Sequence, residues 1–164
     1  MDQRIETCGE QRPPLCGDSM LTEVIANAVR VSLTRLFSNG ETFFHCSLVV
    51  TGDGLHPRVA AWSWEALERE SAIKGSSEKY CKKLKISLRD SPYFSYGQEH
   101  FCHANRLLLE RPARSQLSRE AWGLELGLRL QSMEDAISRL DEEGLFGVNQ
   151  PRAKVTVLVE IMGP

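Results

Sequence analysis

The residues most typical of metal chemistry are His100-Phe101-Cys102-His103. His100 and His103 lie three residues apart, so on a helix they share a face, as two metal ligands require. A structural zinc site needs four ligands, and no second ligand pair follows at a recognisable spacing. We therefore expect these histidines to be packed or solvated, and we expect the protein to use no metal and no cofactor.

The candidates for a catalytic nucleophile also lack partners in the sequence. His45 and Cys46 are adjacent on an expected strand, so their side chains point to opposite faces and do not pair with each other. His56 would reach a cysteine only through the fold. Gly52-Asp53-Gly54 lacks the Lys-Ser/Thr and the helix of a phosphate loop and indicates a hairpin turn. We expect no catalytic residue and hence no enzyme.

Carboxylates are the next candidates, either for acid–base chemistry or for binding a basic partner. Acidic runs on helices are usually solvated faces, here beside Arg69 and Arg139. The acidic groups on two expected helices are Glu65, Glu68 and Glu70, and Asp135, Asp141, Glu142 and Glu143. Of these acids, we assign Asp141, Glu142 and Glu143 to partner binding.

Aromatic residues give the strongest indication of a binding surface. Trp62 and Trp64 flank a junction between a strand and a helix, and we expect one of them to enter the core. Three aromatic residues crowd the loop after Pro92, where they are hard to bury together. Aromatic loop residues are frequent interface anchors. In this loop we predict partner contacts by Asp90, Tyr93, Phe94 and Tyr96.

The first half of the chain predicts a helix, a hairpin and a second helix. Asp18 or Ser19 begins the first helix, and Asn39-Gly40 ends it. The period changes to two in residues 42–50, where Phe44, Cys46, Leu48 and Val50 share a face. A turn leads to a second strand at 58–62, and Ser63 caps a helix over 64–73. Leu84, Ile86 and Leu88 alternate with Lys83, Lys85 and Ser87, which predicts a half-exposed strand at 82–88 whose solvated face carries the basic run of lysines 79, 82, 83 and 85.

The second half predicts a helix at 98–110, a long helix at 118–143 and a closing strand at 154–162. The long helix has apolar residues on two faces, so we expect it to be central and packed on both sides. The closing strand directs Val155, Val157, Val159 and Ile161 inward. The fold class is α+β: one domain over 18–164, with a mostly antiparallel sheet of about four or more strands covered by helices. Residues 1–17 are expected to be a flexible leader.

Composition restricts the function further. The chain has 164 residues, 41% hydrophobic and 26% charged, with a formal charge of -2. It lacks the basic excess of a general nucleic-acid binder, so we expect no nucleic acid as partner. Five cysteines without a CxxC pair indicate reduced thiols. With no signal peptide and no long apolar run, we expect a cytoplasmic protein that does not contact membranes.

Several segments together resemble a bacterial family, the domain of unknown function numbered 4303. The chain departs from the family pattern at Ile86-Ser87, where the family has a Trp-Ser pair, and it stops at Gly163-Pro164. The matching segments span about residues 20–164: Thr51-Gly52-Asp53-Gly54-Leu55-His56-Pro57, Trp62-Ser63-Trp64-Glu65-Ala66-Leu67, Asp90-Ser91-Pro92-Tyr93, Leu140-Asp141-Glu142-Glu143-Gly144-Leu145-Phe146-Gly147 and Val157-Leu158-Val159-Glu160-Ile161-Met162.

The resemblance implies a function, because members of this family look like immunity proteins encoded beside polymorphic or contact-delivered toxins. It implies no catalytic residues. The expectation is therefore a monomer that binds one cognate toxin effector domain, contact-dependent or type VI secreted, and blocks its active site. Two alternatives stay open. One is a small cytoplasmic hydrolase with a His/Cys or His/carboxylate site, and the other is a regulatory module that binds a host protein.

Overall fold

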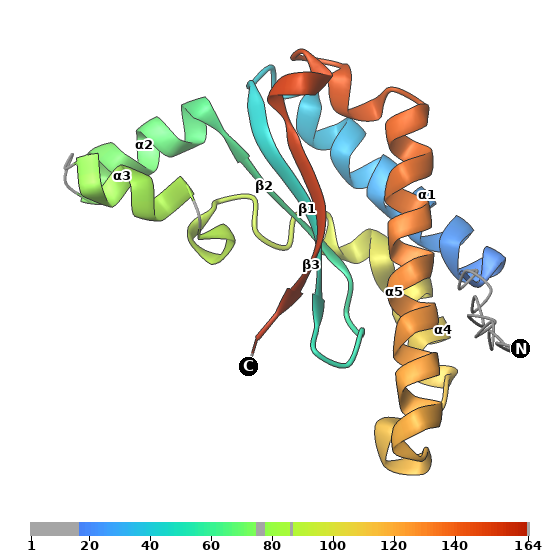
Figure 1. Ribbon diagram of the computed structural model, residues 1–164. Helices are drawn as coiled ribbons and strands as arrows, with labels where there is room; N and C mark the ends of the chain where they lie inside the picture. The colour runs from blue at the N-terminus through green and yellow to red at the C-terminus, as the bar shows by residue number, and fades with distance from the viewer. Residues whose placement is uncertain (1–16, 75–77, 86, 164) are drawn as a thin grey trace, which may run out of the picture.

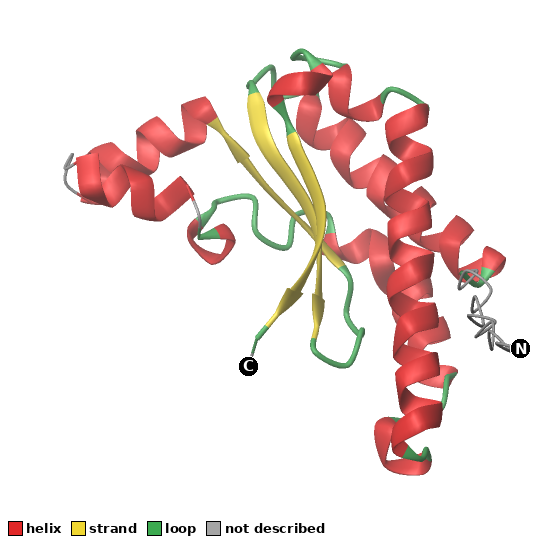
Figure 2. Cartoon of the chain, viewed as in Figure 1, coloured by secondary structure: helices red, strands yellow, loops and turns green. Residues whose placement is uncertain are grey.

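The computed structural model describes residues 17–74, 78–85 and 87–163. It is an α+β fold with one small sheet and helices on both sides (Figures 1 and 2). Apart from Gly17, the expected leader lies outside the described residues. The helices and strands are α1 (Ser19–Phe37), β1 (Phe43–Thr51), β2 (Arg58–Ser63), α2 (Trp64–Lys74), α3 (Glu78–Lys85), α4 (Cys102–Glu110), α5 (Arg119–Glu142) and β3 (Thr156–Met162).

The sheet corrects the expected strand count. Within the described residues it has three strands in the order β2-β1-β3. Strand β1 pairs antiparallel with β2 and parallel with β3, so only one of the two pairings is antiparallel. The predicted strand at 82–88 is wrong, because residues up to Lys85 form helix α3. A short alternating run fits either period, and packing of Leu84 in one cluster with Trp62 favours the helix.

Helices α1 and α5 begin at capping residues, as the sequence predicts. Asp18 Oδ1 accepts the backbone N–H groups of Met20 (3.0 Å) and Leu21 (3.1 Å), and Ser118 Oγ accepts that of Ala121 (3.2 Å). Both helices, together with α4, pack on one face of the sheet and form the larger core with it. That core is the main source of stability, since it buries most of the apolar side chains.

The other face of the sheet carries a smaller core under α2 and α3. Trp62 is fully buried there, whereas Trp64 is exposed, so one tryptophan enters the core as predicted. Ser63 Oγ caps α2 by accepting the N–H of Ala66 (2.9 Å). Phe44 was expected to share a face with Cys46, Leu48 and Val50, but the β1–β2 register shifts between Phe43 and His45. Phe44 therefore packs against the Trp64 ring, with centroids 4.3 Å apart.

A long connection, residues 87–97, comes after α3 in the chain and runs along the outer edge of β2, which it covers. Trp62 Nε1 donates to the carbonyl of Ser87 (3.0 Å), and the N–H of Tyr96 donates to that of Val59 (3.2 Å). Gly97 ends the connection with φ of 66°, and a Cβ there would lie 2.3 Å from Ser32 Oγ of α1. Only glycine fits this position, which fixes the connection against α1.

We had expected helix α5 to be packed on both sides along its length, but it is not. Its fully buried residues begin at Arg129, and Leu124 in the first half is 64% exposed. The reason is visible in Figure 1, where the first half of α5 extends past the sheet beside α4. Ile161 of β3 is likewise exposed and not inward, because it lies at the end of the sheet.

Candidate binding site

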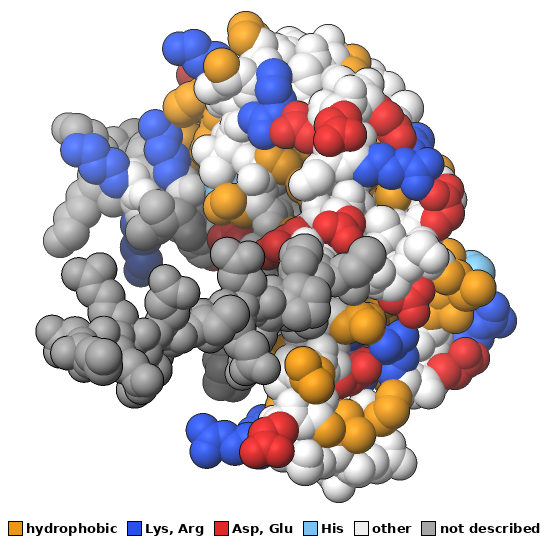
Figure 3. All heavy atoms as spheres, turned by 45° about the vertical axis from the view of Figure 1, so that its right-hand side comes forward, with side chains coloured by type: hydrophobic (Ala, Val, Ile, Leu, Met, Phe, Trp, Pro, Cys, Tyr) orange, Lys and Arg blue, Asp and Glu red, His pale blue; other side chains and the backbone are white. Residues whose placement is uncertain are grey.

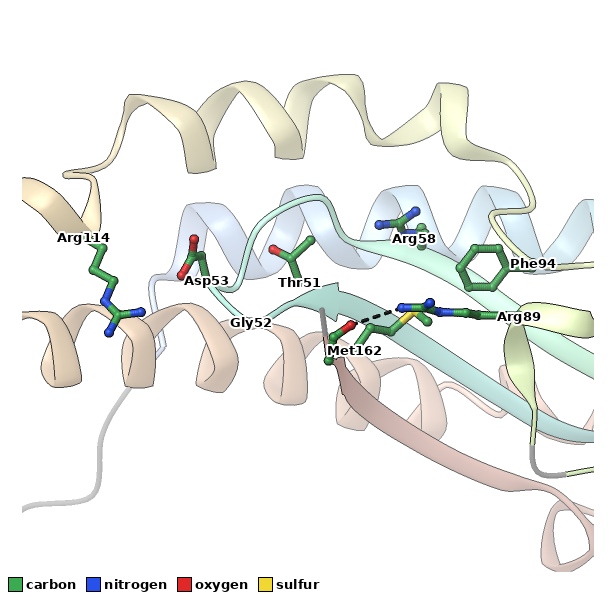
Figure 4. Close-up of a pocket in the computed structure, with 9 residues that line it drawn as sticks. Thr51, Gly52, Asp53, Arg58, Arg89, Phe94, Arg114 and Met162 are labelled. Carbon is green, nitrogen blue, oxygen red and sulfur yellow. Dashed lines mark hydrogen bonds between the residues drawn. The ribbon is translucent and has the colours of Figure 1, made fainter.

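A cavity lies where β1 ends, β2 begins and β3 ends. It has a volume of about 720 Å³ and is open to solvent (Figure 4). The turn between β1 and β2 forms one wall, and the 87–97 connection forms another. We call it the arginine cleft, because three arginines line it. The lining residues that matter for its chemistry are Asp53, Arg58, Arg89, Phe94, Arg114 and Met162.

Arg58 and Arg89 are held in place without a carboxylate. The guanidinium of Arg58 lies over the ring of Phe94, 5.5 Å from its centroid, a cation–π contact. Its Nε is buried and has no hydrogen-bond partner among the described residues. Arg89 donates from Nη2 to the carbonyl of Gly163 (3.1 Å). Both guanidinium groups thus keep most of their donors available to a ligand.

The opposite end of the cleft is positioned by a buried arginine. Arg129 is only 2% exposed and donates to the backbone carbonyls of Asp53 (3.1 Å) and Pro112 (2.9 Å). These bonds tie both the β1–β2 turn and the segment before Arg114 to α5. Figure 4 shows Asp53 and Arg114 near each other at this end, away from Arg58, Arg89 and Phe94.

The cleft is electropositive because its arginines lack the carboxylate partners that several other arginines of the described chain have. Among the described residues, three guanidinium groups and one carboxylate, that of Asp53, line the cleft, a formal excess of two positive charges. Several arginines elsewhere in the described chain form ion pairs with carboxylates, namely Arg30, Arg69, Arg111, Arg129, Arg139 and Arg152. Uncompensated arginines in one cavity favour an anionic ligand, since guanidinium donors match carboxylate and phosphate oxygens.

Of the predicted contact residues, Phe94 lines the cleft and Asp90 is exposed beside Arg89. Asp90 Oδ2 accepts a hydrogen bond from Ser87 Oγ (2.5 Å), so part of its role is to shape the loop. Ser95 adopts φ of 60°, a left-handed conformation unusual for serine. It lies between Phe94, which lines the cleft, and Tyr96, which packs against the core.

Tyr93 and Tyr96 are partly buried structural residues. The Tyr93 ring lies 5.7 Å from that of Phe43 and 6.1 Å from that of Tyr96. Its hydroxyl donates to Glu41 Oε2 (2.7 Å) and accepts from Arg69 Nη2 (3.2 Å). Burial, followed by the bond to Glu41, raises the pKa of Tyr93. The loop does partly bury all three of its aromatic residues.

The predicted acidic contacts at the end of α5 form a separate group. Asp141 binds Arg152 through two bonds (2.5 and 2.7 Å), which lower its pKa. Glu143 binds Arg30 (2.9 Å), whereas Glu142 is exposed. In the described part of the chain, no hydrogen bond or ion pair joins these acids to the 90–96 loop. Acidic and basic side chains alternate on this side of the molecule (Figure 3), so Asp141 and Glu143 are largely neutralised.

One histidine does lie near a hydroxyl and a carboxylate. His45 Nε2 is 2.7 Å from Ser47 Oγ and 3.1 Å from Glu160 Oε2, and Ser47 Oγ also donates to Glu160. No local sequence pattern indicates this cluster, because Glu160 reaches it through the parallel pairing of β1 with β3. The same ring nitrogen makes both contacts, whereas a catalytic triad uses the two nitrogens separately.

The other sequence candidates remain apart. Burial raises the pKa of the Cys46 thiol to about 12, so it stays protonated. His100 lies 3.6 Å from a Glu99 oxygen. Among residues 17–74, 78–85 and 87–163, no three His, Cys, Asp or Glu side chains are grouped to hold a metal ion. Sequence reasoning missed Arg58, Arg89 and Arg114, which are isolated in the chain and carry no motif.

The fold and the cleft define a small α+β protein with a cationic binding cleft at one end of its sheet. The chain belongs to the family described as Domain of unknown function (DUF4303), which matches residues 25–164. No curated protein and no solved structure matches it. Within the described residues, no helix has the length and apolar character needed to cross a membrane.

Proposed function

We propose that this protein is an immunity protein, which binds a cognate toxin effector domain in the cytoplasm and blocks its active site in a one-to-one complex. The family resemblance motivates the identity of the partner. The structural observation that carries the proposal is an open sheet edge. Strand β3 has β1 as its one strand neighbour in the described structure, and no described strand pairs with its other edge, although residues 87–89 lie beside its last residues.

Strand β3 lacks the features that normally protect a sheet edge. Edge strands are usually shielded by lysine, proline, bulges or covering segments, as the 87–97 connection shields β2. In β3 the only charged side chain, Glu160, is bound to His45 and Ser47. Leu158 is 45% exposed and Ile161 is 53% exposed. A protein partner that adds a strand here would gain backbone hydrogen bonds and cover both apolar side chains.

The interface we propose therefore differs from the one that the sequence suggested. It is centred on β3 and extends toward Asp90 and Phe94 at the mouth of the cleft, whereas Tyr93, Tyr96, Asp141 and Glu143 serve mainly the fold. Glu142 remains available on a separate surface. A stable protein interface buries about 800 Å² on each partner, an area that one strand and its flanks can supply only together with neighbouring loops.

The test is co-expression followed by titration. The toxin domain encoded beside this gene is expressed with and without this protein, and the purified partners are titrated. Rescue of growth together with a nanomolar complex, about -12 kcal/mol, is the expected result. Absence of both rescue and binding would refute the proposal.

A second candidate function, a small hydrolase, is favoured by the cluster of His45, Ser47 and Glu160. Ser47 is almost fully buried and lies on the central strand β1, which is paired on both sides. A nucleophile in this position lacks free backbone N–H groups to form an oxyanion hole. Activity against ester substrates that disappears in both Ser47→Ala and His45→Gln would establish this function, and its persistence in either variant would reject the cluster as its source.

A further inference from the structure

We propose that the arginine cleft, which adjoins the end of β3, binds an organic phosphate of about nucleotide size. This inference does not depend on the proposed immunity function. It rests on the charge of the cleft, on the way its arginines are held and on the cavity that they surround.

The charge of the cleft matches a dianion. Its formal excess of two positive charges comes from Arg58, Arg89 and Arg114 against Asp53. Within the described residues, none of the three arginines forms an ion pair, and only Arg89 donates a hydrogen bond, to the Gly163 carbonyl. A phosphate monoester carries a charge of about -1.5 to -2 at neutral pH and three acceptor oxygens. A single carboxylate, by contrast, is satisfied by one guanidinium fork, so the neighbouring Arg58 and Arg89 favour the phosphate, while Arg114 adds positive charge at the other end of the cleft.

Arg58 and Arg89 are also held in position before any ligand binds. Stacking on Phe94 orients the Arg58 guanidinium, and the bond to Gly163 anchors Arg89 at the end of β3. The Nε of Arg58 is buried, so the donors that a ligand in the cleft can reach are its Nη groups. An anion accepting from the Nη groups of Arg58 and Arg89 would use donors that the protein leaves largely free.

The rest of the cavity suits the non-phosphate part of a ligand. Its volume of about 720 Å³ falls within the range of about 300–1,000 Å³ typical of small-molecule sites. Phe94 and Met162 provide an apolar wall near the arginine pair. Asp53 lies at the far end, where its carboxylate can accept hydrogen bonds from ligand amines or hydroxyls (Figure 4).

The experiment is a calorimetric titration of the full-length protein at low salt with three probes: AMP, adenosine and citrate. AMP is expected to bind at least about tenfold more tightly than adenosine, since charged hydrogen bonds contribute at least that factor. AMP is also expected to bind more tightly than citrate, the ligand that a site selective for carboxylates would prefer. Equal or tighter binding of adenosine or of citrate would overturn the proposal, as would no binding of AMP.

Variants assign the binding to the cleft. Arg58→Gln/Arg89→Gln is expected to weaken the affinity for AMP by at least about tenfold. Arg114→Gln, at an exposed position, is a second variant that leaves the contacts of Phe94 and Gly163 unchanged. The matched control is Arg119→Gln, an exposed arginine at the start of α5. AMP binding that is unchanged in both cleft variants, or weakened equally in the control, would place the ligand elsewhere and contradict the inference. Toxin binding is measured separately, so the two proposals fail independently.

Discussion

Arg129 and Arg58 lie at the same end of the molecule but have opposite surroundings. Arg129 is buried, and its Nε donates to Glu125 Oε1 (2.8 Å) while its other nitrogens donate to backbone carbonyls. Glu125 also binds Arg111 (2.6 Å), which reaches Asp18 at the start of α1 (3.1 Å). We call these four residues the paired network. Arg58, like Arg114, has no carboxylate partner in the described structure.

The difference separates arginines that hold the fold from arginines that are available to a ligand. A buried guanidinium is tolerated only when its donors are satisfied, so the paired network must form for the chain to fold. The cleft arginines lie at the surface of a cavity, where solvent reduces that requirement. The two groups meet at Asp53, whose carbonyl is held by Arg129 and whose side chain lines the cleft.

The largest effect is expected when the paired network is broken. Glu125→Gln removes the charge between Arg111 and Arg129, and loss of one partner from a buried ion pair costs about 3 kcal/mol or more. Glu134→Gln, at an exposed position of the same helix, is the control and should change stability by less than about 0.5 kcal/mol. Urea denaturation measures both. Equal stability of the two variants would show that the network does not stabilise the fold.

The pH dependence of stability should report the same network with a smaller effect. Burial raises the pKa of Glu125, but hydrogen bonds from Arg111 and Arg129 outweigh it, so the folded pKa is lowered. Such a group stabilises fully above its unfolded pKa of about 4.3, and the contribution is lost as pH falls through the lower folded pKa. The unfolding free energy should therefore fall below about pH 4.3, and less steeply in Glu125→Gln. Parallel profiles for the variant and the unsubstituted protein would contradict this assignment.

Tyr93 tests whether a residue expected at an interface belongs to the fold. Tyr93→Phe keeps the ring but removes the hydroxyl that bonds Glu41 and Arg69, at a cost of about 1 kcal/mol. Tyr96→Phe is the control, since its ring packs against the same core. Thermal unfolding compares the two variants. A loss of toxin affinity in Tyr93→Phe without a loss of stability would instead assign Tyr93 to the interface.

The smallest effect on stability is expected in the cleft. Arg58→Gln/Arg89→Gln removes two positive charges that lack carboxylate partners, and each change should alter the unfolding free energy by about 0.5 kcal/mol or less. Denaturation under the conditions used for Glu125→Gln gives a direct comparison. A loss comparable to that of Glu125→Gln would show that these arginines are structural too.

Local signals in the sequence predicted much of the fold. Asp18, Ser63 and Ser118 marked helix starts, and Gly52-Asp53-Gly54 marked the hairpin turn. Residues 82–88 failed because a short alternating run does not distinguish a strand from a helix. The parallel pairing of β3 with β1 depends on the whole chain, and so does the cleft. Arg58, Arg89 and Arg114 are brought together only by the packing of distant segments.

The most direct test of the proposed function is the affinity of the toxin domain for a protein with a blocked β3 edge. Leu158→Lys/Ile161→Lys adds charge to an exposed edge and should leave the fold intact. Its control is Leu124→Lys, at a leucine on α5 that is more exposed than either edge residue. We predict that the edge variant weakens the complex by about a hundredfold, or about 2.8 kcal/mol, while the control binds like the unsubstituted protein. Equal affinity of the edge variant and the control would contradict docking at β3.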